Sequence, residues 1–170
     1  MSETVTEVIE GAPGSVLAQL QRAVQAAQEE KHLELPVPGL NGLLVVRYRP
    51  LGPEQMDRYV AKRARIIDKG GELADLSSTD SSLDLMAQAC VCLLAGGEPL
   101  EHDGSPVRFD ARLADVLNIA FPPGYEPTAR EVILRLFGQN AMSVDAHASR
   151  LLDWMRDPEA VGLGESPAGG

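Results

Sequence analysis

The segment from Leu83 to Leu94 is the most apolar part of the chain, and it restricts the fold more than any other feature. Its sequence, LDLMAQACVCLL, follows a run of Ser, Thr and Asp residues and is closed by Gly96-Gly97. Wound as a helix, this run is apolar on nearly every side, and a helix of that kind has to be buried. We therefore predict a central helix over residues 83–94, around which the other elements pack.

Start signals and apolar spacing predict five further helices. Thr128 can cap a helix whose apolar residues recur at i, i+3, i+4, i+7 and i+8, and Gly138 ends it. Pro53 suits the first turn of a helix, with Glu54 near the positive end of its dipole. We expect helices over residues 15–31, 53–69, 110–118, 128–137 and 143–156. The 53–69 helix should bury a stripe formed by Met56, Tyr59, Val60, Ile66 and Ile67.

Two short β-hairpins are also expected. The segments 33–35 and 43–48 flank a turn region that contains Asn41-Gly42, a strong hairpin signal. Pro36 limits the first arm to the edge of a sheet, because proline cannot donate a ladder hydrogen bond. Asp103-Gly104 gives a second hairpin signal between residues 99–101 and 107–109.

These elements predict a mainly α fold, a single-domain helical bundle around the buried 83–94 helix. Aromatic residues are scarce, at 4 %, which favours helix packing over a β-sandwich. We expect a flexible N-terminus over 1–14, one α-rich domain over 15–157 and a disordered tail over 158–170. The first helix, 15–31, can form a mobile arm, because its stripe of Leu17, Leu20 and Val24 is only weakly amphipathic.

The net charge of −10 argues against general binding to nucleic acid or to anionic membranes. The charge is unevenly spread: residues 47–69 carry seven basic and three acidic side chains, whereas residues 70–103 carry seven acidic and no Lys or Arg. The N-terminus lacks a signal-peptide pattern, and no segment has the roughly 20 apolar residues of a membrane span. We expect a cytoplasmic protein.

No catalytic, cofactor or metal site emerges from the residue pattern, and we predict a protein that is not an enzyme. Cys90 and Cys92 point about 200° apart on a helix, so we expect two buried, inert thiols. Ser143 and His147 are four residues apart, but no acid is placed to orient the imidazole. We therefore expect His147 to be a surface histidine near a helix start.

The second half of the chain contains DGSPVRFDARLA (103–114), AREVILRLFG (129–138) and a last helix ending LDWM (152–155). In this order, these segments resemble the tail assembly chaperones of long-tailed, siphovirus-type bacteriophages of actinobacteria. The Pro-rich hairpin and the helix from Pro53 to Asp68 are compatible with it, so it covers roughly residues 33–156. The helix over 15–31 has no counterpart in the family pattern.

The resemblance implies a non-enzymatic helper in virion assembly, confined to the host cytoplasm and absent from the mature virion. Such a protein binds the tape measure protein, keeps it in solution and helps to recruit tail tube protein. Family members often have a longer product made by ribosomal frameshifting. The resemblance implies neither a cofactor nor a nucleic-acid or membrane partner.

Arg58, Lys62 and Arg65 are the contact residues we predict for this client, because their spacing places them on one side of a helix. The same face could bind the acidic 70–103 region of a second copy, so self-association is a further option. Three alternatives stay open: a connector or minor tail protein of the virion, a small nucleic-acid-binding regulator using the 53–69 helix, and an enzyme whose site converges from loops.

Overall fold

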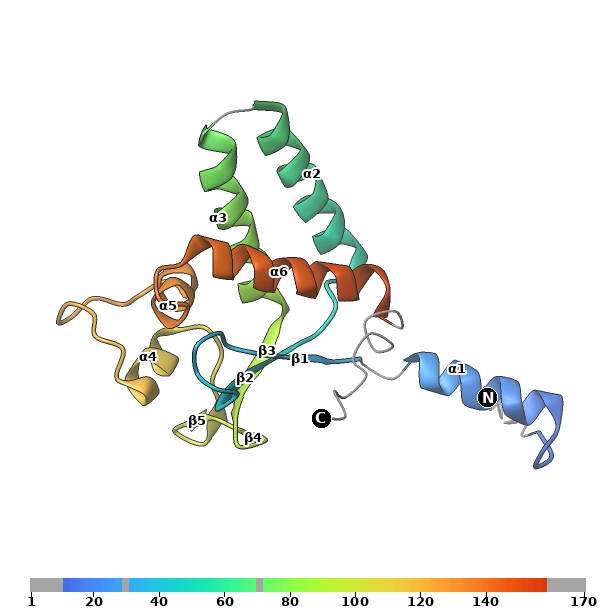
Figure 1. The fold of residues 1–170 in the computed structure, drawn as a ribbon. Helices are drawn as coiled ribbons and strands as arrows, with labels where there is room; N and C mark the ends of the chain where they lie inside the picture. The colour runs from blue at the N-terminus through green and yellow to red at the C-terminus, as the bar shows by residue number, and fades with distance from the viewer. Residues whose placement is uncertain (1–10, 29–30, 70–71, 159–170) are drawn as a thin grey trace, which may run out of the picture. The chain divides into compact units, whose positions relative to one another are not determined.

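The computed structural model describes residues 11–28, 31–69 and 72–158. Internal contacts divide the chain into two compact units, residues 1–31 and residues 32–170, and each is described by itself. Parts of the expected flexible N-terminus, 1–14, and nearly all of the expected tail, 158–170, lie outside the described residues. Helices and strands are labelled in Figure 1.

The first unit contains one described helix, α1, from Val16 to Gln28. Ser15 caps it as expected, since its Oγ accepts a hydrogen bond from the Ala18 amide at 3.1 Å. The preceding residues fold back onto the helix, where the Gly11 amide donates to Gln21 Oε1 at 3.1 Å. A Cβ atom at position 11 would lie 2.7 Å from the Ala18 nitrogen, so this close approach requires glycine.

The second unit is built on an antiparallel sheet with the order β1-β2-β3-β4. The predicted first hairpin is confirmed: β1 (Leu33–Pro36) pairs with β2 (Leu44–Tyr48), and the proline-containing strand lies at the sheet edge. β3 (Cys90–Ala95) pairs with β2 on its other side, with Val46 opposite Leu93. A short β4 (Glu98–Pro99) completes the sheet.

The predicted helix over 83–94 is wrong in its second half. Helix α3 runs from Glu72 to Ala89 and passes directly into β3 at Cys90. In the described residues the fold is therefore mixed α/β, not mainly α with hairpins at the side. Residues 90–94 take the extended form because they lie between β2 and β4, where their backbone groups complete the sheet ladder.

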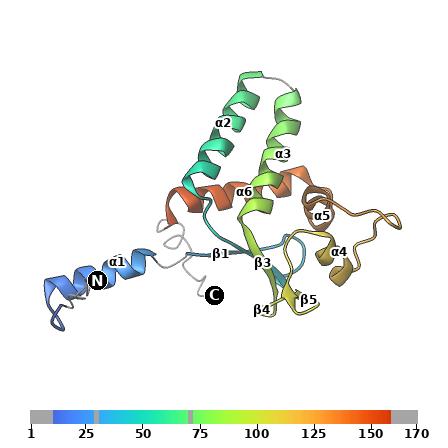
Figure 2. The same ribbon diagram turned by 180° about the vertical axis from the view of Figure 1, so that it is seen from behind.

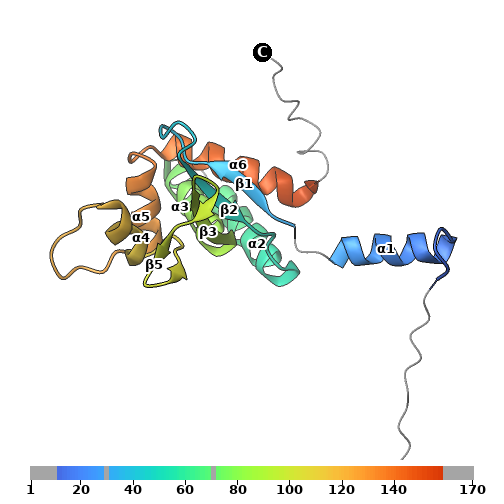
Figure 3. The ribbon, with the colours of Figure 1, turned by 90° about the horizontal axis from the view of Figure 1, so that it is seen from below.

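The remaining described elements of the second unit are helices and a short hairpin. Helix α2 (Pro53–Lys69) and α3 follow β2 in the chain and precede β3, and they form an antiparallel pair. Helix α6 (Ala141–Arg156) crosses the base of that pair (Figures 1 and 2). Helices α4 (Ala111–Leu117) and α5 (Ala129–Leu136) lie beside each other (Figure 3). A second hairpin forms around Asp103-Gly104 as predicted, but its strands, β5 (Glu101–His102) and β6 (Ser105–Pro106), are shorter and closer to the turn than the predicted arms 99–101 and 107–109.

Helix ends follow the sequence signals closely. Asp110 caps α4, and Thr128 forms a reciprocal capping box with Glu131 at the start of α5. The last helix begins earlier than expected, because Asn140 rather than Ser143 caps it. The end of α3 is covered by Arg108, whose side chain donates to the carbonyls of Ala87 and Cys90.

The described core lies in the second unit and joins the sheet to α3, α5 and α6. Its most deeply buried large side chains are Tyr48, Leu35, Leu83, Leu85, Met86, Leu93, Leu113, Ile133 and Leu151. Both cysteines are buried, as predicted, although they lie on a strand and not on a helix. The apolar face expected for the last helix is confirmed by the burial of Val144, Ala148, Leu151 and Leu152.

Candidate protein-binding surface

Helix α2 carries the predicted contact residues, and the structure separates them into two groups. Arg58 and Arg65 are exposed, and the Arg58 guanidinium lies 3.8 Å from Glu54, one turn away on the same helix. Lys62 instead turns toward α3, where its Nζ atom lies 2.9 Å from Asp84 Oδ2. The predicted face is therefore a mixture of exposed charge and a helix-to-helix ion pair.

Asp84 joins three helices through its two carboxylate oxygens. Lys62 of α2 donates to one oxygen, and Arg130 of α5 donates to both, at 2.8 and 2.7 Å. Arg130 also lies 3.6 Å from Asp80. Partial burial raises the pKa of Asp84, but the hydrogen bonds from Arg130 and Lys62 outweigh it and lower the pKa below its ordinary value. Lys62 thus contributes to the packing of α2 on α3.

A cleft of about 250 Å³ lies between α2 and α3 beside this ion pair. Its lining is polar and comes from both helices: Gln55, Arg58, Tyr59, Lys62, Ser81, Asp84 and Gln88. Arg58 therefore stands at the margin of a hollow in which a partner's acidic side chain could be held beside two cations.

A second cleft, of about 390 Å³, lies between α2 and α6. Val60, Ala64 and Leu152 give it apolar surface, and its charged lining consists of Arg63, Arg156 and Asp153. Val60 was expected in the buried stripe of its helix, but its side chain is 53 % exposed, so that part of the prediction is wrong. Tyr59 is buried and Met56 half-buried as expected, whereas the side chains of Ile66 and Ile67 lie outside the described residues.

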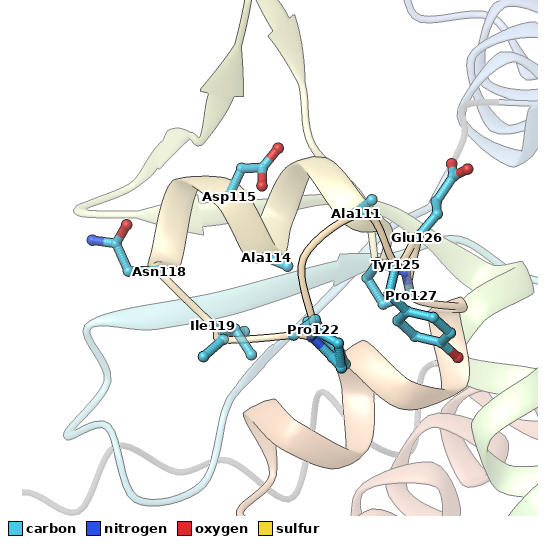
Figure 4. A pocket seen from close by; sticks show the side chains of 12 residues that line it. Ala111, Ala114, Asp115, Asn118, Ile119, Pro122, Tyr125, Glu126 and Pro127 are labelled. Carbon is cyan, nitrogen blue, oxygen red and sulfur yellow. The ribbon is translucent and has the colours of Figure 1, made fainter.

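The loop between α4 and α5 borders two further cavities that the residue pattern did not indicate. A cavity of about 640 Å³ lies between α4 and this loop (Figure 4), and one of about 370 Å³ lies on its other side. Tyr125, 48 % exposed, donates to Glu131 at 2.6 Å, and the Arg135 guanidinium lies 5.2 Å from the Phe121 ring centre. The Phe-Pro-Pro-Gly-Tyr sequence signals a turn, but not the cavities on either side of it.

His147 is buried, so the prediction of a surface histidine is wrong. Its Nε2 atom is hydrogen-bonded to the hydroxyl of Tyr48 at 2.8 Å, and the ring meets Phe137 edge-on. Burial lowers the pKa of His147 to about 4 and raises the pKa of Tyr48. Burial likewise raises the pKa of Cys90 to about 12, so this thiol stays protonated and unreactive at neutral pH.

Among residues 11–28, 31–69 and 72–158, no three His, Cys, Asp or Glu side chains converge in a way that could hold a metal ion. No helix in these same ranges is long and apolar enough to span a bilayer. Comparison of the chain with protein-family models, curated proteins and solved structures gives no match.

Proposed function

We propose that the protein is a non-enzymatic chaperone of bacteriophage tail assembly, which binds the tape measure protein in the host cytoplasm and assists assembly of the tail tube. The family resemblance of residues 33–156 supports this function. The observation that carries it is the α2 surface, where exposed Arg58 and Arg65 accompany an apolar cleft whose margin carries two more arginines.

This surface suits a helical client with an apolar stripe and acidic flanks. A helix laid into a groove gains affinity mainly from its apolar side chains, which the exposed Val60 and Ala64 can contact. The basic residues add charge complementarity, which guides the encounter and sets the register. Exposed ion pairs alone contribute roughly 0.2–1 kcal/mol each, so the apolar cleft has to supply most of the affinity.

The first test changes charge on the exposed part of the surface. We expect Arg58→Glu with Arg65→Glu to reduce co-purification of a co-expressed tape measure protein at least about tenfold. Lys62 is left intact, because its ion pair with Asp84 supports the fold. The matched control is Arg22→Glu with Lys31→Glu, which makes the same change in net charge outside the 32–170 unit.

The second test addresses the apolar cleft. Val60→Ser removes exposed apolar surface at the cleft without opening a buried cavity, so the melting temperature should stay the same while client binding falls. If both α2 variants retain the client as well as the control does, this surface is not the contact. If the unaltered protein binds no tail protein of its own genome, the chaperone proposal has to be abandoned.

The alternative of a nucleic-acid-binding regulator receives less support from the same helix. Of its cations, Lys62 is paired with Asp84, and Arg63 donates to the Tyr59 hydroxyl at 3.1 Å. Phosphate binding needs several cations directed outward together, and it weakens steeply with salt. Retention of duplex DNA by the unaltered protein in about 150 mM salt, lost in the Arg58/Arg65 variant, would favour the regulator instead.

A further inference from the structure

We propose that helix α1 pairs with α1 of a second copy of this chain, so that the protein forms a weak dimer through its N-terminal unit. The inference rests on the apolar seam, the exposure and the charge of α1 alone. It is therefore independent of the function proposed for α2.

The apolar residues of α1 follow the spacing of a coiled-coil seam. Leu17, Leu20, Val24 and Ala27 are separated by three, four and three residues, which places them at successive a and d positions of a heptad. Leu17 is 42 % exposed, Leu20 58 % and Val24 48 %. Val16, which precedes Leu17 and lies beside the seam at a g position, is 81 % exposed.

Among residues 11–28, the contacts of the first unit leave this seam uncovered. The segment before the helix contacts Ala18, at a b position away from the seam, and Gln21, at an e position beside it, and Ser15 caps the end. A helix of 13 residues is marginal in water by itself, and burial of an apolar face is what normally stabilises it. A partner that covers the seam would supply that burial.

The charge of α1 favours a second copy as the partner. The whole chain carries a net charge of −10, but the only charged residue between Val16 and Gln28 is Arg22. Arg22 lies on the side of the helix opposite the seam, at an f position. The positions that flank the seam, such as Gln21, Ala23 and Gln28, are uncharged, so two identical seams can meet without like-charge pairs beside them.

The size of the seam limits the strength of the dimer. Thirteen helical residues span about 20 Å, or two heptads. Two such helices bury less than the roughly 1,200 Å² of a stable interface, so we expect a reversible dimer with a Kd on the order of 10⁻⁴ M. Each copy carries a net negative charge outside the seam, so the two copies repel each other. Because salt screens this repulsion, added salt should strengthen pairing or leave it unchanged.

Sedimentation equilibrium of the full chain, from about 10 μM to 1 mM, tests the inference at the expected Kd. The unaltered protein should pass from monomer to dimer over this range. Leu17→Glu with Leu20→Glu should stay monomeric, because it places carboxylates in the seam. Gln19→Glu with Gln25→Glu adds the same charge on exposed positions away from the seam and should still dimerise.

Disulfide trapping locates the contact. Leu20→Cys should cross-link to itself in a parallel pair, and mixed Leu20→Cys and Val24→Cys chains should cross-link in an antiparallel one, whereas Gln25→Cys should not. The native thiols are buried and do not interfere. A monomer at every concentration would overturn the proposal, as would a dimer that persists in the seam variant. Self-association that weakens with salt would point instead to the α2 surface on an acidic region.

Discussion

At the scale of single residues, Tyr48 and His147 show how two polar groups can be buried at low cost. They come from β2 and α6, 99 positions apart, and each satisfies the other by one hydrogen bond of 2.8 Å. The register of β2 on β3 shifts between Arg47 and Tyr48, where the ladder is irregular. No local signal links these residues, so their pairing could not be predicted from the sequence. His147 itself lies three residues after Val144 and four before Leu151, so its spacing places it on the apolar face of α6, a signal that the prediction of a surface histidine overlooked.

The lowered pKa of His147 predicts a loss of stability in mild acid. The unfolded chain gains a proton near pH 6.5 and the folded chain only near pH 4, so the free energy of unfolding falls as the pH drops between these values. From pH 7 to pH 5 this one group should lower it by about 2 kcal/mol. Urea unfolding of the unaltered protein and of His147→Gln at both pH values measures the difference.

His147→Gln cannot titrate, so it should show a pH dependence smaller by about that amount, and His147→Phe provides a second non-titrating variant. Asp84 does not obscure the comparison. Its lowered pKa gives a contribution that is lost only in more acidic solution, below its ordinary value of 3.8. An equal pH dependence in all three proteins would show that the folded histidine takes up its proton as easily as the unfolded one.

At the scale of elements, helix boundaries with local chemistry were predictable and the central strand was not. Asp110, Thr128 and the Asn41-Gly42 turn act on their immediate neighbours, and the corresponding elements are confirmed. The run over 83–94 carries no such signal, because a segment apolar on every side fits a buried helix and a buried strand equally well. Which form it takes is decided by β2, which lies more than 40 residues earlier and offers a free edge to pair with.

The strand assignment places Leu93 at the centre of the sheet and predicts severe destabilisation on charge insertion. Leu93 is fully buried opposite Val46, so Leu93→Asp should leave a carboxylate without a partner and cost several kcal/mol, enough to unfold a domain of ordinary stability. Leu43→Asp is the matched control, because Leu43 is 73 % exposed and the change should be nearly neutral. Circular dichroism melting compares the two. A cooperative, unshifted transition in Leu93→Asp would contradict the described core.

At the scale of the whole molecule, the basic residues of the 53–69 helix indicated a candidate binding surface, but not the clefts and ion pairs around it. The basic character of 53–69 is visible in the sequence, and so is the spacing of Arg58, Lys62 and Arg65. The sequence could not show that Lys62 is paired with Asp84, nor that residues of α2 and α6 together line a cleft. Both depend on how segments distant in the chain pack. The predicted basic residues thus lie beside a cleft that the sequence did not indicate, and one of them, Lys62, is also paired with Asp84.

The division into two units predicts that the first can be removed without loss of the second. Every residue of the described core lies between Leu33 and Met155, so a chain that begins at His32 retains the sheet, α2 to α6 and the Asp84 ion pairs. Its melting temperature should stay within about 2 °C of the full chain in dilute solution, where a change of 1 kcal/mol would shift it by more. At high concentration it should remain monomeric, because the α1 seam is absent. Differential scanning calorimetry and sedimentation of both chains measure the two effects separately. A large fall in melting temperature would show that residues 1–31 support the second unit, and a truncated chain that still dimerises would place the self-contact outside α1.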